Sequence, residues 1–126
     1  MRNNRLVAAA AVVAAGLISI SGTATATAAP AASGFDRCAD GNFCLFEHID
    51  GQGRVMGTKR AQSTLPLDFD NITSSIRNRT GQKWSVYTES GFRGRCLTIA
   101  AIWTGNVTQY DMSDKISSIR PGACPA

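Results

Sequence analysis

Histidine is almost absent from this chain, which has a single one, His48, among 126 residues. A metal site built on paired histidines is therefore excluded. A Ser–His–Asp triad would have to use His48, and no residue pattern marks a nucleophile or an oxyanion hole beside it. We expect His48 to lie exposed in a turn, and we expect the protein not to be an enzyme.

A strong charge of one sign is also missing. The chain has 13 basic and 9 acidic residues, and two of the basic ones, Arg2 and Arg5, precede an N-terminal apolar run. The other charges are interspersed, without a basic helix or a basic stripe interleaved with aromatic residues. We therefore expect a solvated, mixed-charge surface and no nucleic-acid partner.

The only long apolar run extends from Leu6 to Ile20. A transmembrane anchor is the alternative interpretation, but this run is shorter than the roughly 20 residues that span a bilayer, and no basic stop-transfer cluster follows it. The basic residues before it and an A-x-A sequence after it, Ala26-Thr27-Ala28, predict a secretory signal peptide. We expect residues 1–28 to be removed and residues 29–126 to form one secreted, extracellular, monomeric domain without membrane contact.

Cysteines are few but even in number, and all four lie in the predicted mature part: Cys38, Cys44, Cys96 and Cys124. In an oxidising compartment such a set predicts two disulfides, for which three connectivities are open. The alternative is free thiols that serve catalysis or bind a metal.

Helical periodicity is absent from the mature part, and short β-rich runs separated by glycine indicate an all-β sandwich or barrel. These runs cover residues 42–47, 54–57, 73–77, 83–88, 96–102 and 115–120. Two blocks then occur twice in the same order: 43–46 with 51–54 matches 84–87 with 92–95, and 71–77 matches 114–120. The domain is therefore a tandem duplication, with motif one at about 38–80 and motif two at about 81–124.

Alternation of side chains along each strand predicts the core. The inward-facing residues are expected to be Phe43, Leu45, Ile76, Trp84, Val86 and Ile119. Phe46 and Tyr87 point to the opposite face, where Tyr87 is expected to pack with Phe92.

Tyr87, Phe92 and Gly94 show the spacing of two aromatics and a glycine that resembles the βγ-crystallin motif, and Gly51 replaces the second aromatic in the first copy. Residues 70–75 and 113–118 resemble the calcium motif of that family, with Ser113 departing at the first position. The resemblance implies a sandwich of two tandem Greek-key motifs. It also implies calcium ligands: side chains of Asn71 and Ser74 in one site and of Asp114 and Ser117 in a weaker one, with carbonyls of Ile72 and Lys115. The alternative is that these polar residues only cap turns.

Residues 38–46 are similar to the N-terminal block of a secreted actinobacterial peptidase-inhibitor family built on a single βγ-crystallin-like domain. The resemblance implies an extracellular peptidase as partner, a metallopeptidase above all, and a reactive segment at Arg95, Cys96 and Leu97. Of the three connectivities we favour Cys38–Cys44 with Cys96–Cys124, although the resemblance implies a second disulfide that is local to the reactive loop. The alternative for Cys96 to Ile99 is an ordinary strand with Leu97 packed or half exposed.

Overall fold

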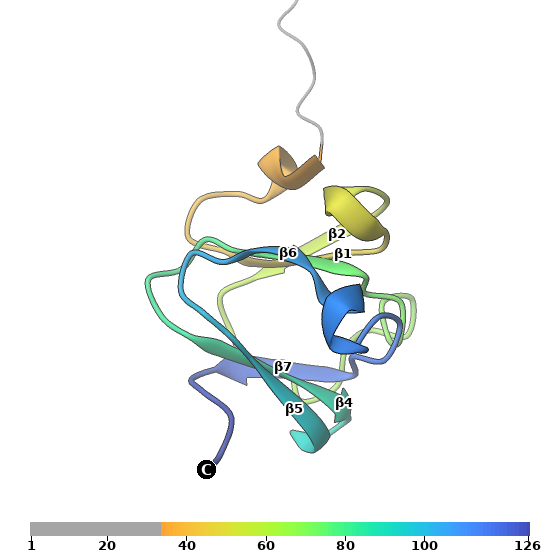
Figure 1. Ribbon diagram of the computed structural model, residues 1–126, viewed down its shortest axis with the longest axis vertical. Coiled ribbons are helices and arrows are strands. Elements are labelled where there is room, and N and C mark those ends of the chain that lie inside the picture. Colours follow the sequence, from red (N-terminus) through yellow and green to blue (C-terminus); the bar gives the residue numbers. More distant parts are fainter. Residues whose placement is uncertain (1–33) are drawn as a thin grey trace, which may run out of the picture. The chain divides into compact units, whose positions relative to one another are not determined.

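The computed structural model describes residues 34–126, so the predicted signal peptide and its cleavage site lie outside the described residues. Within 34–126, two antiparallel sheets face each other across the core (Figure 1). One sheet has the order β2 (Val55–Thr58), β1 (Phe43–Phe46), β3 (Ser75–Asn78) and β6 (Thr104–Asn106), and the other has the order β5 (Arg93–Ile99), β4 (Trp84–Glu89) and β7 (Ser118–Pro121). The helical elements of this region are the short 3-10 turns η2 (Gly34–Arg37), η3 (Ile49–Gly51) and η4 (Val107–Tyr110), and none is long and apolar enough to cross a membrane. The predicted all-β sandwich is confirmed.

The core predicted from side-chain alternation is also confirmed. All six expected residues are fully buried: Phe43, Leu45, Ile76, Trp84, Val86 and Ile119. Phe43 of β1 stacks on Trp84 of β4, with ring centroids 4.4 Å apart and planes inclined by 6°. Equivalent residues of the two copies therefore meet at the centre of the sandwich, where they exclude water from both sheets.

Each copy of the repeat lends a segment to the sheet of the other copy, as a Greek key does. Strand β6 of the second copy pairs with β3, with Gly105 opposite Ile76. In the first copy the corresponding segment is reduced to one bridge, between Gln62 and Ile119 beside β7. The two copies are thus interlocked and share one core.

The aromatic that the first copy lacks is supplied by η2. In the second copy Tyr87 and Phe92 pack edge to face with centroids 5.8 Å apart. In the first copy Phe46 packs in the same way with Phe35, at 5.4 Å. Gly51 stands at the position of Phe92, and a Cβ there would lie 2.5 Å from the main-chain nitrogen of Phe35. The missing side chain at Gly51 therefore makes room for η2, which covers Phe46.

Two elements differ from the sequence-based expectation. The strand expected over residues 96–102 ends at Ile99, and Ile102 lies in a turn with a φ of 65°. Strand β6 was not predicted, because Thr-Gly-Asn has the composition of a turn. It is a strand only because β3 offers its edge to it.

Both favoured disulfides are present. Cys38–Cys44 closes the segment between η2 and β1, and Cys96–Cys124 ties the C-terminal tail to β5 across 28 residues of chain. No cysteine within residues 34–126 is free. The thiol chemistry considered as an alternative is therefore excluded in this oxidised form.

Candidate functional site

The predicted inhibitory segment, Arg95-Cys96-Leu97, lies inside strand β5 and not in a loop. Leu97 stands opposite Val86 of β4, and its half-buried side chain packs against the main core. The structure thus has the ordinary strand of the alternative interpretation. Only part of the Leu97 side chain is therefore accessible to a partner.

Strand β5 instead presents its main chain. It is the outer strand of its sheet, and on its far side no strand of the described region pairs with it. Tyr87 of β4 accepts the Ser117 N–H on the β7 side at 2.9 Å, so its partner Cys96 directs its own N–H and C=O away from β4. By the alternation of a strand, the main-chain N–H and C=O of Thr98 also point away from β4. Thr98 Oγ1 accepts the Cys124 N–H at 3.0 Å, so the disulfide-bound tail holds this edge in place.

Arg95 is fixed by contacts at the other end of β5. Its Nη2 donates to the carbonyl oxygen of Asp111 at 2.6 Å, and Lys115 Nζ lies 3.0 Å from Asp111 Oδ1. The hydrogen bond from Lys115, aided by the charge of Arg95, holds the pKa of Asp111 below its ordinary value. The ammonium group of Lys115 is therefore engaged with Asp111.

The predicted calcium residues do come together, but in pairs that join the two copies. The resemblance to the βγ-crystallin calcium motif predicts one site with Asn71 and Ser74 and another with Asp114 and Ser117. In the structure Ser74 Oγ lies 3.3 Å from Asp114 Oδ1 and 2.9 Å from Ser113 Oγ, and Ser117 Oγ donates to Asn71 Oδ1 at 3.2 Å. Each hydroxyl thus meets side chains of the other copy, because the Greek-key exchange places the two motifs side by side.

Two buried oxygens near these pairs have no hydrogen-bond partner among the described residues, Asp70 Oδ1 and Thr73 Oγ1. A buried oxygen without a partner costs free energy unless another group binds it. Carboxylate, amide and hydroxyl oxygens are the donors that calcium accepts. Within residues 34–126 no three side chains of His, Cys, Asp or Glu could hold a metal ion together. The side-chain donors that meet in the two pairs are all oxygens.

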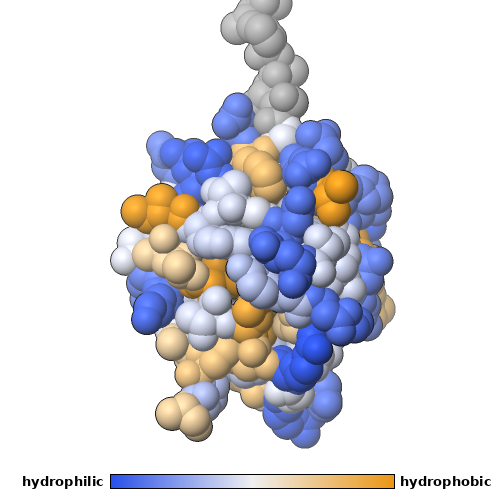
Figure 2. All heavy atoms as spheres, in the orientation of Figure 1, coloured by the Kyte–Doolittle hydropathy of each residue, from blue (hydrophilic) through white to orange (hydrophobic). Residues whose placement is uncertain are grey.

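The surface carries isolated apolar side chains. In the view of Figure 2 the strongly hydrophobic spheres are scattered, and several adjoin weakly hydrophobic ones. The two most exposed large ones are Leu67, at 95%, and Ile102, at 77%. His48 is exposed in the turn before η3, as predicted. Large apolar side chains are thus exposed at few places on the surface of the described region.

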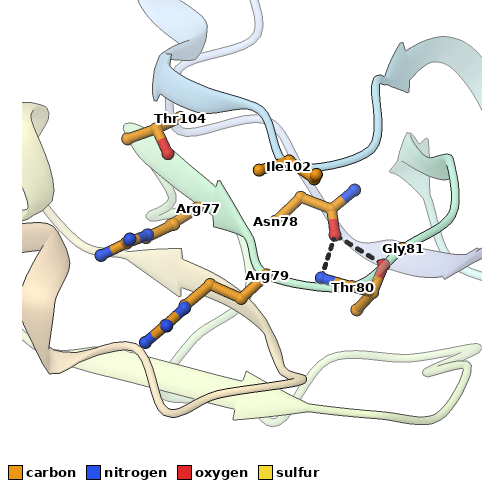
Figure 3. A pocket seen from close by; sticks show the side chains of 7 residues that line it. All are labelled: Arg77, Asn78, Arg79, Thr80, Gly81, Ile102 and Thr104. Atoms are coloured by element: carbon orange, nitrogen blue, oxygen red, sulfur yellow. Dashed lines mark hydrogen bonds between the residues drawn. The ribbon is translucent and has the colours of Figure 1, made fainter.

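A pocket of about 310 Å³ lies at the end of β3, beside one of these apolar side chains (Figure 3). Its lining residues are Arg77, Asn78, Arg79, Thr80, Gly81, Ile102 and Thr104. Arg77 donates to the carbonyl oxygen of Phe35 at 3.0 Å, and Arg79 forms an ion pair with Asp40. Both guanidinium groups thus have partners within the domain. Sequence reasoning missed Ile102, since it had placed this residue in a strand.

Comparison with protein families identifies the family of this chain. Residues 31–99 match the model of peptidase inhibitor family I36. The chain belongs to this family. It is accordingly a non-enzymatic inhibitor whose partner is a peptidase. The match includes all of β5 and ends at its last residue, so the turn with Ile102 and the tail with Cys124 lie beyond it.

Solved structures similar to this inhibitor are βγ-crystallin domains. A chain solved in work on the evolution of the eye lens βγ-crystallin fold has a TM-score of 0.63 and 18% identity, over 68% of this chain and 88% of that one. A βγ-crystallin from Ciona intestinalis has a TM-score of 0.59 and 26% identity, over 65% and 100%. A domain from Clostridium beijerinckii has a TM-score of 0.55 and 22% identity, over 64% and 95%. These likenesses establish the fold. No curated protein matches the chain.

Proposed function

We propose that this protein inhibits an extracellular metallopeptidase of the thermolysin type, acting as a secreted monomer through the outer edge of β5. The observation that carries the proposal is the unpaired main-chain edge at Cys96 and Thr98. An extended partner segment can add to such an edge through main-chain hydrogen bonds. The proposed peptidase partner would supply such a segment at the wall of its substrate cleft.

The disulfide supports the same proposal. Cys96–Cys124 and the bond from Cys124 to Thr98 hold the edge before any partner arrives. A segment that is already ordered loses less conformational entropy on binding, so more of the contact energy appears as affinity. Two disulfides also suit an extracellular location.

Inhibition of a thermolysin-like metallopeptidase, beside a serine peptidase as control, tests this proposal. We expect sub-micromolar inhibition of the metallopeptidase alone. A Thr98→Pro variant lacks the outward N–H and should inhibit about tenfold less, the effect of one strong hydrogen bond. Proline is tolerated on an edge strand.

The matched control is Thr98→Val, which keeps the N–H and loses only the hydroxyl. It should weaken inhibition much less than Thr98→Pro does, because the disulfide Cys96–Cys124 still holds the edge. If Thr98→Pro inhibited as strongly as its matched control Thr98→Val, the β5 edge would be ruled out as the inhibitory site. If the wild type inhibited no metallopeptidase, the target class would be ruled out.

A second candidate function is calcium binding with a structural role, which the oxygen pairs across the two copies favour. Ser74 with Asp114, and Ser117 with Asn71, would hold the ion, together with carbonyls of the Ile72 and Lys115 segments. Calcium would also give a positive partner to the buried Asp70 Oδ1, which has no hydrogen-bond partner among the described residues. Few carboxylates converge, so the expected dissociation constant is about 10⁻⁵–10⁻³ M.

Calcium at ten times its dissociation constant should stabilise the fold by about 1.4 kcal/mol and raise Tm by about 6 °C. The rise should disappear in a Ser74→Ala/Ser117→Ala double variant and persist in Thr98→Val. Differential scanning calorimetry with calcium and with magnesium measures it. A Tm that calcium leaves unchanged would exclude this second function.

A further inference from the structure

The backbone at Ile102 is held in a conformation that its side chain disfavours. Its φ of 65° lies in the left-handed region, where a β-branched residue is a genuine outlier. The other non-glycine residues of the described region with positive φ are Asp50, Asn71, Phe92, Asp111 and Asp114. Asp and Asn tolerate this region, and Phe92 gains its contact with Tyr87. The side chain of Ile102 gains no comparable contact within the domain.

The side chain of Ile102 gains little from the domain in return. It is 77% exposed and belongs to neither apolar cluster of the core. Ala100 and Ala101 before it are exposed as well. Three exposed apolar residues in succession are unusual on a surface that only meets water, and they are expected where a partner binds.

The turn is nevertheless rigid, because a buried side chain holds it from below. Asn78 is fully buried, its Nδ2 donates to the carbonyl oxygen of Ala100 at 2.9 Å, and its N–H donates to that of Trp103 at 2.7 Å. Trp103 N–H in turn donates to Ala100 at 3.2 Å. Ile102 is therefore presented in one fixed position, in which binding would cost little further order.

The place of this turn connects it with the proposed inhibitory edge. β5 ends at Ile99, three residues before Ile102, so the edge and the turn form one continuous stretch of chain. Figure 3 shows Ile102 next to Asn78, on the other side of the pocket from the Arg77 and Arg79 side chains. Thr80 and Thr104 also line this pocket. A single apolar side chain within a polar rim is the arrangement that binding hot spots have.

We propose that Ile102 is the residue that determines peptidase binding, entering an apolar specificity pocket of the metallopeptidase while the β5 edge lies along the cleft. The inference rests on the proposed function and deepens it. The hydrogen bonds of buried Asn78 hold the turn despite the strain at Ile102, and they keep the side chain projecting toward a partner. Strain of this kind gathers at functional sites.

An Ile102→Gly variant tests the proposal, because it separates binding from stability. Glycine adopts a positive φ without strain, so we expect Tm to rise by about 4 °C. Inhibition of the thermolysin-like metallopeptidase should nevertheless weaken by at least about 30-fold, the effect of removing a hot-spot side chain. A residue with a merely structural role would not lose inhibition while the fold gains stability.

Two further variants serve as controls. Leu67→Ala removes the other highly exposed apolar side chain and should leave inhibition within about twofold of the wild type, as is usual for residues outside hot spots. Ile102→Leu keeps an aliphatic side chain and should retain most of the inhibition. If Ile102→Gly inhibited as strongly as the wild type, this inference would be overturned and the proposed function would stand. Absence of inhibition by the wild type would overturn the proposed function and this inference with it.

Discussion

Replacing Gly51 by alanine is expected to lower the free energy of unfolding by about 3 kcal/mol. The new Cβ would lie 2.5 Å from the main-chain nitrogen of Phe35 and 2.8 Å from the carbonyl carbon of Gly34. Both are backbone atoms, so η2 would have to move away from Phe46. Overpacking costs about 1–3 kcal/mol, and the φ of 69° at residue 51 adds about 1–2 kcal/mol for a residue with a Cβ. Urea denaturation monitored by tryptophan fluorescence measures the loss.

Two glycine controls separate the causes of this effect. Gly122 has a φ of 103° and open space around it, so Gly122→Ala should cost only the backbone strain, about 1–2 kcal/mol. Gly81 has neither a positive φ nor a neighbour within 4 Å, so Gly81→Ala should change stability by less than about 1 kcal/mol. If Gly51→Ala proved no more costly than Gly122→Ala, η2 would not be the close neighbour that the structure shows.

Removing the disulfide Cys96–Cys124 with a Cys96→Ala/Cys124→Ala double variant should cost about 3–4 kcal/mol. The bond closes a loop across 28 residues, and its loss frees that loop in the unfolded chain. For a domain of about 100 residues this is a large share of the total stability. Equilibrium urea denaturation of the oxidised wild type and of the variant measures the difference.

Thr98→Val is the matched control for the disulfide. It removes only the hydrogen bond from Cys124 N–H to Thr98 Oγ1, which should cost no more than about 1.5 kcal/mol. A double cysteine variant that lost less than 1.5 kcal/mol would mean that the tail contributes little beyond that bond. The double cysteine variant can also be assayed for inhibition, because the tail that carries Cys124 holds the β5 edge.

The sequence of this inhibitor determined by itself those features that follow from local pattern. Alternation along short runs identified the inward residues Phe43, Leu45, Trp84 and Val86, all of which are fully buried. The repeat identified the duplicated fold, because equivalent positions of two copies must satisfy the same backbone geometry. The aromatic and glycine spacing at Tyr87, Phe92 and Gly94 predicted the packing of Tyr87 against Phe92 in the second copy. The alternation and the aromatic spacing depend on residues close together in the sequence, and the repeat appears when the two copies are compared.

The tertiary structure alone decided the features that join distant segments. Phe35 fills the place left open by Gly51, Ser74 faces Asp114 of the other copy, and β6 becomes a strand because β3 offers its edge. Leu97 turns inward because its place in β5 is set by pairing with β4. Ile102 takes a positive φ because Asn78 holds the turn on both sides. Each of these depends on groups brought together by chain reversal, and a one-dimensional pattern carries no information on that approach.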